Sequence, residues 1–150
     1  MIGIADLIQP ADIYLGVPLE TKKDVLRFLA ERVSAKCGSR PEECRHALAA
    51  REKLGSTAIG AGIAFPHAQL EGLTQPMAIF VRPEVPVAFA AADEGPVDLI
   101  LMLLSPVGDT RAHLEGLASL AKVLRAPDMV KTLRQAESTQ DVVDAFIHPH

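Results

Sequence analysis

The first part of the chain carries apolar positions at helical spacing, bounded by residues that start and end helices. Ile13–Val17 is predicted to form a short strand. The helical period after it is carried by four positions: Val25, Phe28, Leu29 and Val33. Thr21, with Asp24 three residues later, is typical of a helix N-cap, and Gly38 is typical of a helix end. We therefore predict a helix between Thr21 and Gly38.

A second helix is predicted to follow and to reach about Lys53. Ser39, Pro41 and Glu42 have the pattern of a capping box, and Gly55 marks the end of the helix.

The next segment changes from a small-residue loop to a short apolar stretch. Residues 55–62 (GSTAIGAG) contain only small residues and one isoleucine, and residues 63–65 are apolar. Pro66 disfavours continuation of a regular element at this point. We expect His67, the next residue, to lie in a loop.

Two runs, residues 77–81 and 97–104, are apolar except at Asp98 and replace the helical period in the middle of the chain. Such runs are typical of strands buried on both faces. Helical spacing then returns over residues 109–126, 128–136 and 138–147. Buried strands interleaved with helices predict an α/β layered domain. Because no repeat, low-complexity tract or long linker interrupts the pattern, we predict that residues 1–150 form one domain.

Charge and composition exclude several classes of protein. The formal net charge is −4 and basic residues form no tract, which argues against a nucleic-acid partner held through phosphates. The apolar runs are far shorter than the roughly 20 residues of a membrane-spanning helix. Cys37 and Cys44 match no metal or redox spacing. A reducing cytoplasm suits such cysteines, so we expect a cytoplasmic protein.

The glycine-rich segment fits none of the common glycine motifs. A phosphate-binding loop has Lys and then Ser or Thr after its second glycine, where this chain has Ala61 and Gly62. A dinucleotide fingerprint requires a third glycine, which is missing. A serine-hydrolase elbow requires glycines two residues before and after the serine, and Ser56 has Leu54 and Ala58 there. Exposed backbone amides of such a loop could still hold a phosphoryl group.

Three side chains are candidates for phosphoryl chemistry. His67 could accept a phosphoryl group, because a neutral imidazole keeps one nitrogen lone pair free while the other nitrogen is held by a hydrogen bond. His113 lies near a predicted helix N-terminus, where the helix dipole disfavours the imidazolium, so it could donate a hydrogen bond. Arg51 could neutralise a transferring phosphoryl group. The plain alternatives are a surface loop histidine, a solvated histidine near a cap, and an arginine that stabilises a helix C-terminus. A metal site is disfavoured, because neither histidine has a second ligand at a recognisable spacing.

Residues 51–67 (REKLGSTAIGAGIAFPH) closely resemble the signature of the enzyme IIA domains of the fructose/mannitol class of the phosphotransferase system. The resemblance covers nearly the whole chain. It begins at residues 4–8 (IADLI) and continues at residues 70–73 (LEGL), 96–99 (PVDL) and 113–124 (HLEGLASLAKVL). Ala58, Ala61 and Ala68 depart from the commonest pattern, and the likeness thins after Ala136. Within the family, the chain is most similar to the nitrogen-regulatory branch.

The resemblance implies a three-layer α/β/α domain around a small mixed sheet. It implies that His67 is phosphorylated, on Nε2, and that His113 and Arg51 complete the site; we also expect Ser56, Thr57 and Gly62 to bind the phosphoryl group. The expected donor is a phosphorylated HPr-like carrier protein, and regulatory proteins are expected to read the phosphorylation state. No cofactor is expected. We further expect a partner to contact apolar residues beside His67: Ala61, Ala64, Phe65 and Ala68.

Two other functions remain open at this stage. The chain could be a sugar-specific IIA component that passes phosphate to a membrane transporter. It could also be a binding module that has kept the fold without the chemistry, although the joint presence of His67, His113 and Arg51 argues against this.

Overall fold

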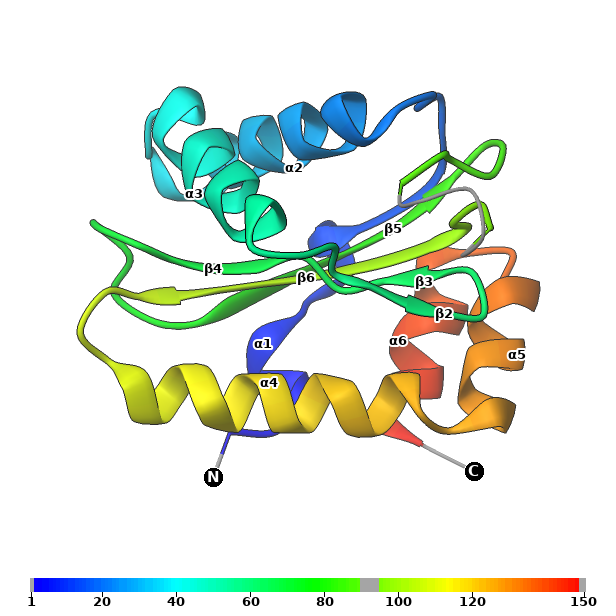
Figure 1. Cartoon of the computed structure of the whole chain (residues 1–150). Coiled ribbons are helices and arrows are strands. Elements are labelled where there is room, and N and C mark those ends of the chain that lie inside the picture. Colours follow the sequence, from blue (N-terminus) through cyan, green and yellow to red (C-terminus); the bar gives the residue numbers. More distant parts are fainter. Residues whose placement is uncertain (1, 90–94, 149–150) are drawn as a thin grey trace.

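A mixed β-sheet lies between two layers of helices in the computed structural model, which describes residues 2–89 and 95–148 (Figure 1). Helices α2 (Lys22–Cys37) and α3 (Pro41–Lys53) cover one face. The other face is covered by α1 (Ile4–Leu7), α4 (Thr110–Leu124), α5 (Pro127–Gln135) and α6 (Thr139–Ile147). A 3₁₀ turn (Pro10–Asp12) precedes the first strand. The predicted three-layer α/β/α architecture is confirmed.

The strands follow the order β1-β5-β6-β3-β2, and β4 pairs with β6 beyond the end of β3. Their bounds are β1 (Ile13–Val17), β2 (Ala58–Gly60), β3 (Ile63–Ala64), β4 (His67–Leu70), β5 (Met77–Pro83) and β6 (Leu99–Pro106). β6 pairs in parallel with β3 and β4 and antiparallel with β5, so the sheet is mixed.

The two central strands separate two hydrophobic cores. Every residue of β6 from Leu99 to Ser105 is buried, and β5 is buried except at Arg82. Alternate residues of these strands enter opposite cores, as the two-residue period of a strand requires. Leu101 and Leu103 pack toward α4, whereas Met102 and Leu104 pack toward α2 and α3. The prediction of strands buried on both faces is confirmed.

The helix ends test the capping predictions. Thr21 and Asp24 form the predicted capping box, and Gly38 ends α2 with a φ of 73°. The capping box predicted at Ser39 is wrong. Arg40 is the N-cap of α3 and makes no side-chain cap, and within the described ranges the Ser39 hydroxyl has no hydrogen-bond partner. Pro41 at the first helical position sets the start of this helix without a side-chain cap.

The segment between α3 and β5 is more regular than predicted. Residues 58–60 of the expected loop form β2, which turns into β3. His67 is the first residue of β4 and not part of a loop. Pro66 is compatible with this strand, because its carbonyl still accepts a hydrogen bond from the Leu103 amide (3.0 Å) and a proline lacks only the donor.

A glycine in α4 sets the distance between this helix and the sheet. A Cβ atom added at Gly116 would lie 3.0 Å from Leu103 Cδ2 and 3.1 Å from Cδ1. The helix can therefore lie closer to β6 here than a larger residue would permit. His113 lies one turn before Gly116, and Leu103 is the register partner of His67. The close approach of α4 thus brings the two histidines together.

Candidate active site

A hydrogen bond to a nearby backbone carbonyl holds the His67 ring in one tautomer. Its Nδ1 lies 2.9 Å from the carbonyl oxygen of Phe65. A carbonyl oxygen only accepts hydrogen bonds, so Nδ1 carries the proton and Nε2 keeps a lone pair. Phe65 is itself fixed, since its amide donates to the Thr57 carbonyl (2.9 Å) and its side chain is buried. The ring nitrogen of His67 that keeps an available lone pair is therefore Nε2.

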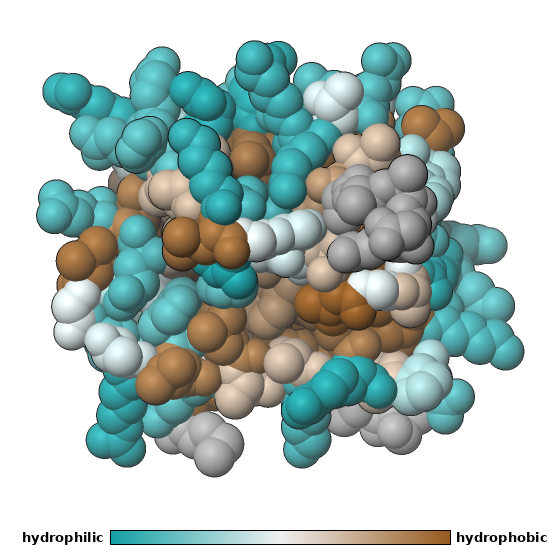
Figure 2. Space-filling model, viewed as in Figure 1, coloured by the Kyte–Doolittle hydropathy of each residue, from teal (hydrophilic) through white to brown (hydrophobic). Residues whose placement is uncertain are grey.

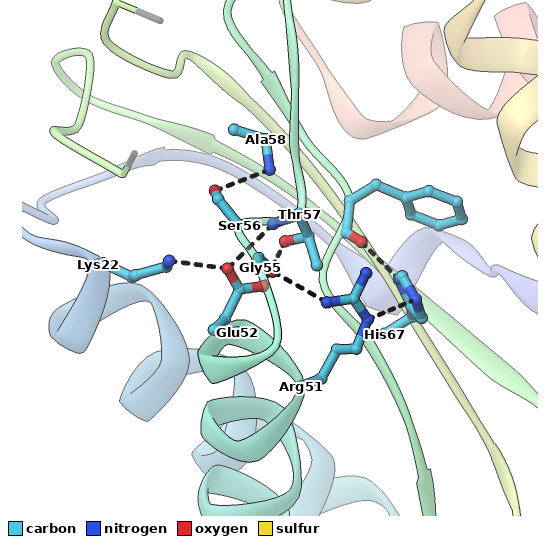
Figure 3. Close-up of polar contacts among 9 residues, drawn as sticks. Lys22, Arg51, Glu52, Gly55, Ser56, Thr57, Ala58 and His67 are labelled. Carbon is cyan, nitrogen blue, oxygen red and sulfur yellow. Dashed lines mark hydrogen bonds and ion pairs between the residues drawn. The ribbon is translucent and has the colours of Figure 1, made fainter. Parts of the chain in front are cut away.

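Arg51 reaches this nitrogen from the last turn of α3 (Figure 3). Its Nε donates to His67 Nε2 at 3.2 Å, and its Nη1 donates to the Gly55 carbonyl at 2.9 Å. Because a guanidinium has five N–H donors, two such bonds leave others for an incoming anion. Arg51 and His67, both predicted to belong to the site, are therefore in direct contact.

His113 approaches from the opposite helical layer. The ring centroids of His67 and His113 are 5.9 Å apart, and the rings are tilted by 46°. Asp109 caps α4 by accepting from the Ala112 amide, and His113 lies one residue further on. Its Nδ1 is 2.8 Å from the hydroxyl of Ser105, a fully buried residue of β6. Two imidazoles and one guanidinium thus converge from β4, α4 and α3.

The surroundings of both imidazoles favour the neutral form. Burial lowers the pKa of His67, and the Arg51 guanidinium lowers it further, while the Phe65 hydrogen bond and the Glu52 charge act in the opposite direction. Burial also lowers the pKa of His113, and the neighbouring His67 adds to this effect. A neutral ring with a free Nε2 lone pair is the form required of a nucleophile.

Glu52 holds the loop that follows α3, a role the sequence did not reveal. Its side chain is only 6% exposed and forms an ion pair with Lys22 at the start of α2 (2.8 Å). Its carboxylate accepts hydrogen bonds from the Thr57 amide (3.1 Å) and from the Thr57 hydroxyl. Figure 3 shows these contacts beside the bond from Arg51 to Gly55. Glu52 thereby fixes both ends of the short loop whose Gly55 carbonyl orients Arg51.

The three loop residues expected to bind a phosphoryl group occupy different environments. The amide and hydroxyl of Thr57 are both bonded to Glu52, so these contacts do not support a direct phosphoryl contact. The Ser56 hydroxyl accepts from the Ala58 amide, and this exposed residue stays adjacent to the site.

Gly62 lies away from the histidines. Its carbonyl accepts from the amides of Asp98 and Leu99, at the opposite end of β6 from Leu103. A Cβ atom at Gly62 would come within 2.7 Å of Asp98 and Arg134 side-chain atoms, and φ is +80°. The glycine is therefore required by the turn and by the ion pair of Asp98 with Arg134. Its position gives no support to a role in phosphoryl binding.

Neither a metal cluster nor a membrane-spanning helix is found in residues 2–89 and 95–148. No three His, Cys, Asp or Glu side chains of this part group together in a way that could hold a metal ion. None of its helices is long and apolar enough to cross a membrane. The site brings together two imidazoles and one guanidinium, an arrangement suited to accepting and stabilising an anionic group.

The chain is similar to known proteins in sequence and in structure. The chain matches the family described as "Phosphoenolpyruvate-dependent sugar phosphotransferase system, EIIA 2" over residues 6–148. A nitrogen regulatory protein of Bradyrhizobium diazoefficiens is 36% identical over 146 residues, covering 97% of this chain and 95% of the relative. The nitrogen regulatory protein of Escherichia coli K12 is 39% identical over 127 residues, covering 84% of this chain and 78% of the relative.

The same fold is present in a solved relative. The crystal structure of nitrogen regulatory protein IIA-Ntr from Neisseria meningitidis has a TM-score of 0.86 and 32% identity, covering 93% of this chain and 95% of that one. The chain belongs to the EIIA 2 family of the phosphotransferase system. The predicted family and its nitrogen-regulatory likeness are confirmed.

The lowered pKa of His67 predicts how this residue titrates. Its apparent pKa should lie below the ordinary value of about 6.5, so that His67 becomes protonated at a lower pH than an ordinary histidine does. Replacing Arg51 with Ala should raise this pKa, because the change removes a nearby positive charge and admits water. Imidazole chemical shifts followed by NMR against pH measure both values. Arg45→Ala, which removes an exposed cation from the same helix, is the matched control and should leave the His67 titration unchanged; an unshifted titration in Arg51→Ala would contradict the assignment.

Proposed function

We propose that this protein is a phosphocarrier: His67 Nε2 accepts a phosphoryl group from a phosphohistidine of an upstream carrier protein, and partner proteins read the result. The observation that carries the proposal is the fixed tautomer of His67, whose Nε2 lone pair faces Arg51. The relatives named above, nitrogen regulatory proteins of a phosphotransferase-system family, support it.

The transfer exchanges one phosphorus–nitrogen bond for another. The lone pair of His67 Nε2 forms the new bond to phosphorus while the bond to the donor imidazole breaks, and its electron pair stays on the donor nitrogen. The proton on His67 Nδ1 stays in place, held by the Phe65 carbonyl. Because both partners are imidazoles, the reaction is nearly balanced and reversible, and catalysis rests on positioning and charge stabilisation.

Arg51 has to change partners during this reaction. One lone pair cannot both accept the Arg51 N–H and attack phosphorus, so the 3.2 Å hydrogen bond is broken as the donor arrives. The guanidinium then turns its donors toward the phosphoryl oxygens, where planar N–H groups bind strongly. The bond to Gly55 keeps Arg51 near the site during this exchange.

The partner surface differs from the one expected from sequence. Ala64 and Phe65 are buried, so neither can contact a partner, and that expectation is wrong for them. Other apolar residues, which come shortly after Arg51, Ser105 and His113 in the sequence, are exposed instead. Leu54 is 84% exposed, Val107 54% and Leu114 59%. Figure 2 shows hydrophobic surface across the middle of this view of the molecule, between more hydrophilic surface above and below. We propose that the donor and the regulated partners bind over the exposed side chains of Leu54, Val107 and Leu114.

A sugar-specific role is the alternative, since the family description names a sugar phosphotransferase system. The nitrogen regulatory relatives, which cover most of this chain, favour the regulatory role. The chemistry at His67 is the same in both cases.

The direct test is phosphorylation by a phosphorylated HPr-like carrier. The wild-type protein should gain a label that is lost in acid and kept in alkali, and His67→Ala should gain none. His46→Ala removes an exposed histidine from α3 and should be labelled like the wild type. Alkali-labile label, or label retained in His67→Ala, would rule out His67 as the acceptor.

Arg51 and His113 should each accelerate the transfer. Arg51→Ala and His113→Ala remove one contact to the transferring group, so each should slow the transfer by about 10–1000-fold, which corresponds to roughly 1.4–4 kcal/mol. Rapid-quench measurements with a phosphorylated carrier give these rates, and circular dichroism checks that the variants are folded. Arg45→Ala serves as the control with wild-type rate. A wild-type rate in either site variant would remove that residue from the site.

Phosphorylation should also change the affinity for regulated partners. The phosphoryl group adds about −1.5 to −2 charges beside exposed apolar residues, and burying it against a partner without a matching cation is costly. We expect a difference of tenfold or more in Kd between the two forms. Calorimetry with partners captured on the immobilised protein measures it, with His67→Asp as a charge mimic. Equal affinities for both forms would leave the protein a relay without a regulatory output.

A further inference from the structure

Ser105 is a polar residue enclosed in a strand that is otherwise apolar. It is fully buried, and its neighbours Leu103 and Leu104 are fully buried as well. Along β6 it lies two residues from Leu103, so its side chain points to the same face of the sheet, toward α4. A hydroxyl in such surroundings is unfavourable unless it forms a hydrogen bond. The bond it forms is to His113 Nδ1, at 2.8 Å.

The direction of this bond decides the tautomer of His113. A serine hydroxyl has one proton to donate, and across residues 2–89 and 95–148 the His113 ring nitrogen is the one acceptor found for it. If Nδ1 carried the ring proton, the Ser105 proton would have no acceptor, and a buried donor without a partner is costly. The hydroxyl therefore donates to Nδ1, and the ring proton of the neutral imidazole lies on Nε2.

We propose that Ser105 is a positioning residue that holds His113 in the Nε2–H tautomer, with this N–H as the donor to a phosphoryl oxygen on His67. The proposal rests on the proposed function and adds a division of roles between the two rings. The Phe65 carbonyl leaves His67 with a lone pair on Nε2, and the Ser105 hydroxyl leaves His113 with a proton on Nε2. With ring centroids 5.9 Å apart, one ring accepts the phosphoryl group and the other stabilises its charge.

A tautomer fixed in advance favours the transfer step in particular. A His113 with its proton on Nδ1 would point a lone pair at the phosphoryl oxygens and repel them. Preorganised donors aimed at developing charge are worth more than donors that must first rearrange. Ser105 contacts neither the donor nor the phosphoryl group in this arrangement, so its removal should slow the transfer without weakening the binding of the donor protein.

The experiment compares Ser105→Ala with Ser105→Thr, which keeps a hydroxyl. In ¹⁵N NMR spectra, His113 should be the Nε2–H tautomer in the wild type and in Ser105→Thr, and a mixture of tautomers in Ser105→Ala. Ser119→Ala is the matched control: it removes a serine hydroxyl from α4, the helix that carries His113, where it is bonded to the Ile2 carbonyl, and it should leave the His113 tautomer unchanged. An Nδ1–H tautomer in the wild type, or an unchanged tautomer in Ser105→Ala, would overturn the proposal.

Transfer kinetics test the second half of the proposal. With a phosphorylated HPr-like carrier as donor, Ser105→Ala should lower the maximal transfer rate about 3–10-fold, the effect of one hydrogen bond, and leave the half-saturating donor concentration unchanged. In a His113→Ala background the same change should have no further effect, because Ser105 acts through His113. A shifted tautomer with an unchanged rate, or additive losses in the double variant, would also overturn it. Failure of the wild type to be labelled would count against the proposed function instead, because the NMR readout does not depend on transfer.

Discussion

The hydrogen bond from His67 Nδ1 to the Phe65 carbonyl is the interaction on which the rest of the site depends. It spans 2.9 Å, and it makes Nε2 the only ring nitrogen with an available lone pair. The backbone around it is fixed twice, by the bond from the Phe65 amide to Thr57 and by the bond from the Leu103 amide to Pro66. A ring free to change tautomer would keep its lone pair on Nε2 only part of the time. Strand pairing on either side of Phe65 and Pro66 therefore determines the chemistry of His67.

The site lies where the three layers of the fold meet. β4 places His67 along β6, α3 supplies Arg51 from one helical layer, and α4 supplies His113 from the other. Each contribution has its own local support. Glu52, paired with Lys22, fixes the loop that orients Arg51, and Gly116 lets α4 approach Leu103. The residues proposed to act on the phosphoryl group are thus few, and a second set of residues sets their positions.

The sequence predicted the layered architecture and named the three residues that converge in the structure, and it missed the residues that support them. Continuous apolar runs identified β5 and β6, because burial on both faces leaves a pattern visible in one dimension. His67, Arg51 and His113 were found through residue chemistry and family likeness. Ser105 and Glu52 were not, because a serine in an apolar strand and a glutamate at a helix end are ordinary until tertiary contacts are known. Lys22 and Glu52, for example, meet only because α2 packs against α3.

The wrong predictions for single segments and loop residues have physical causes as well. β2 and β4 are short strands stabilised by pairing with β3 and β6, and a segment rich in small residues carries no period that would reveal them. Thr57 looked like a free loop residue because its partner, Glu52, precedes the loop on α3. Gly62 looked like a phosphate-binding glycine, although its conformation serves a turn beside Asp98 and Arg134.

The central claim is that the Phe65 carbonyl directs phosphorylation to one nitrogen of His67. The most direct measurement is a ³¹P–¹⁵N correlation on the phosphorylated, ¹⁵N-histidine-labelled protein, which identifies the nitrogen bonded to phosphorus. The account predicts phosphorus on Nε2, with the proton still on Nδ1 and still bonded to the Phe65 carbonyl. Phosphorus on Nδ1, or on any other histidine, would contradict it.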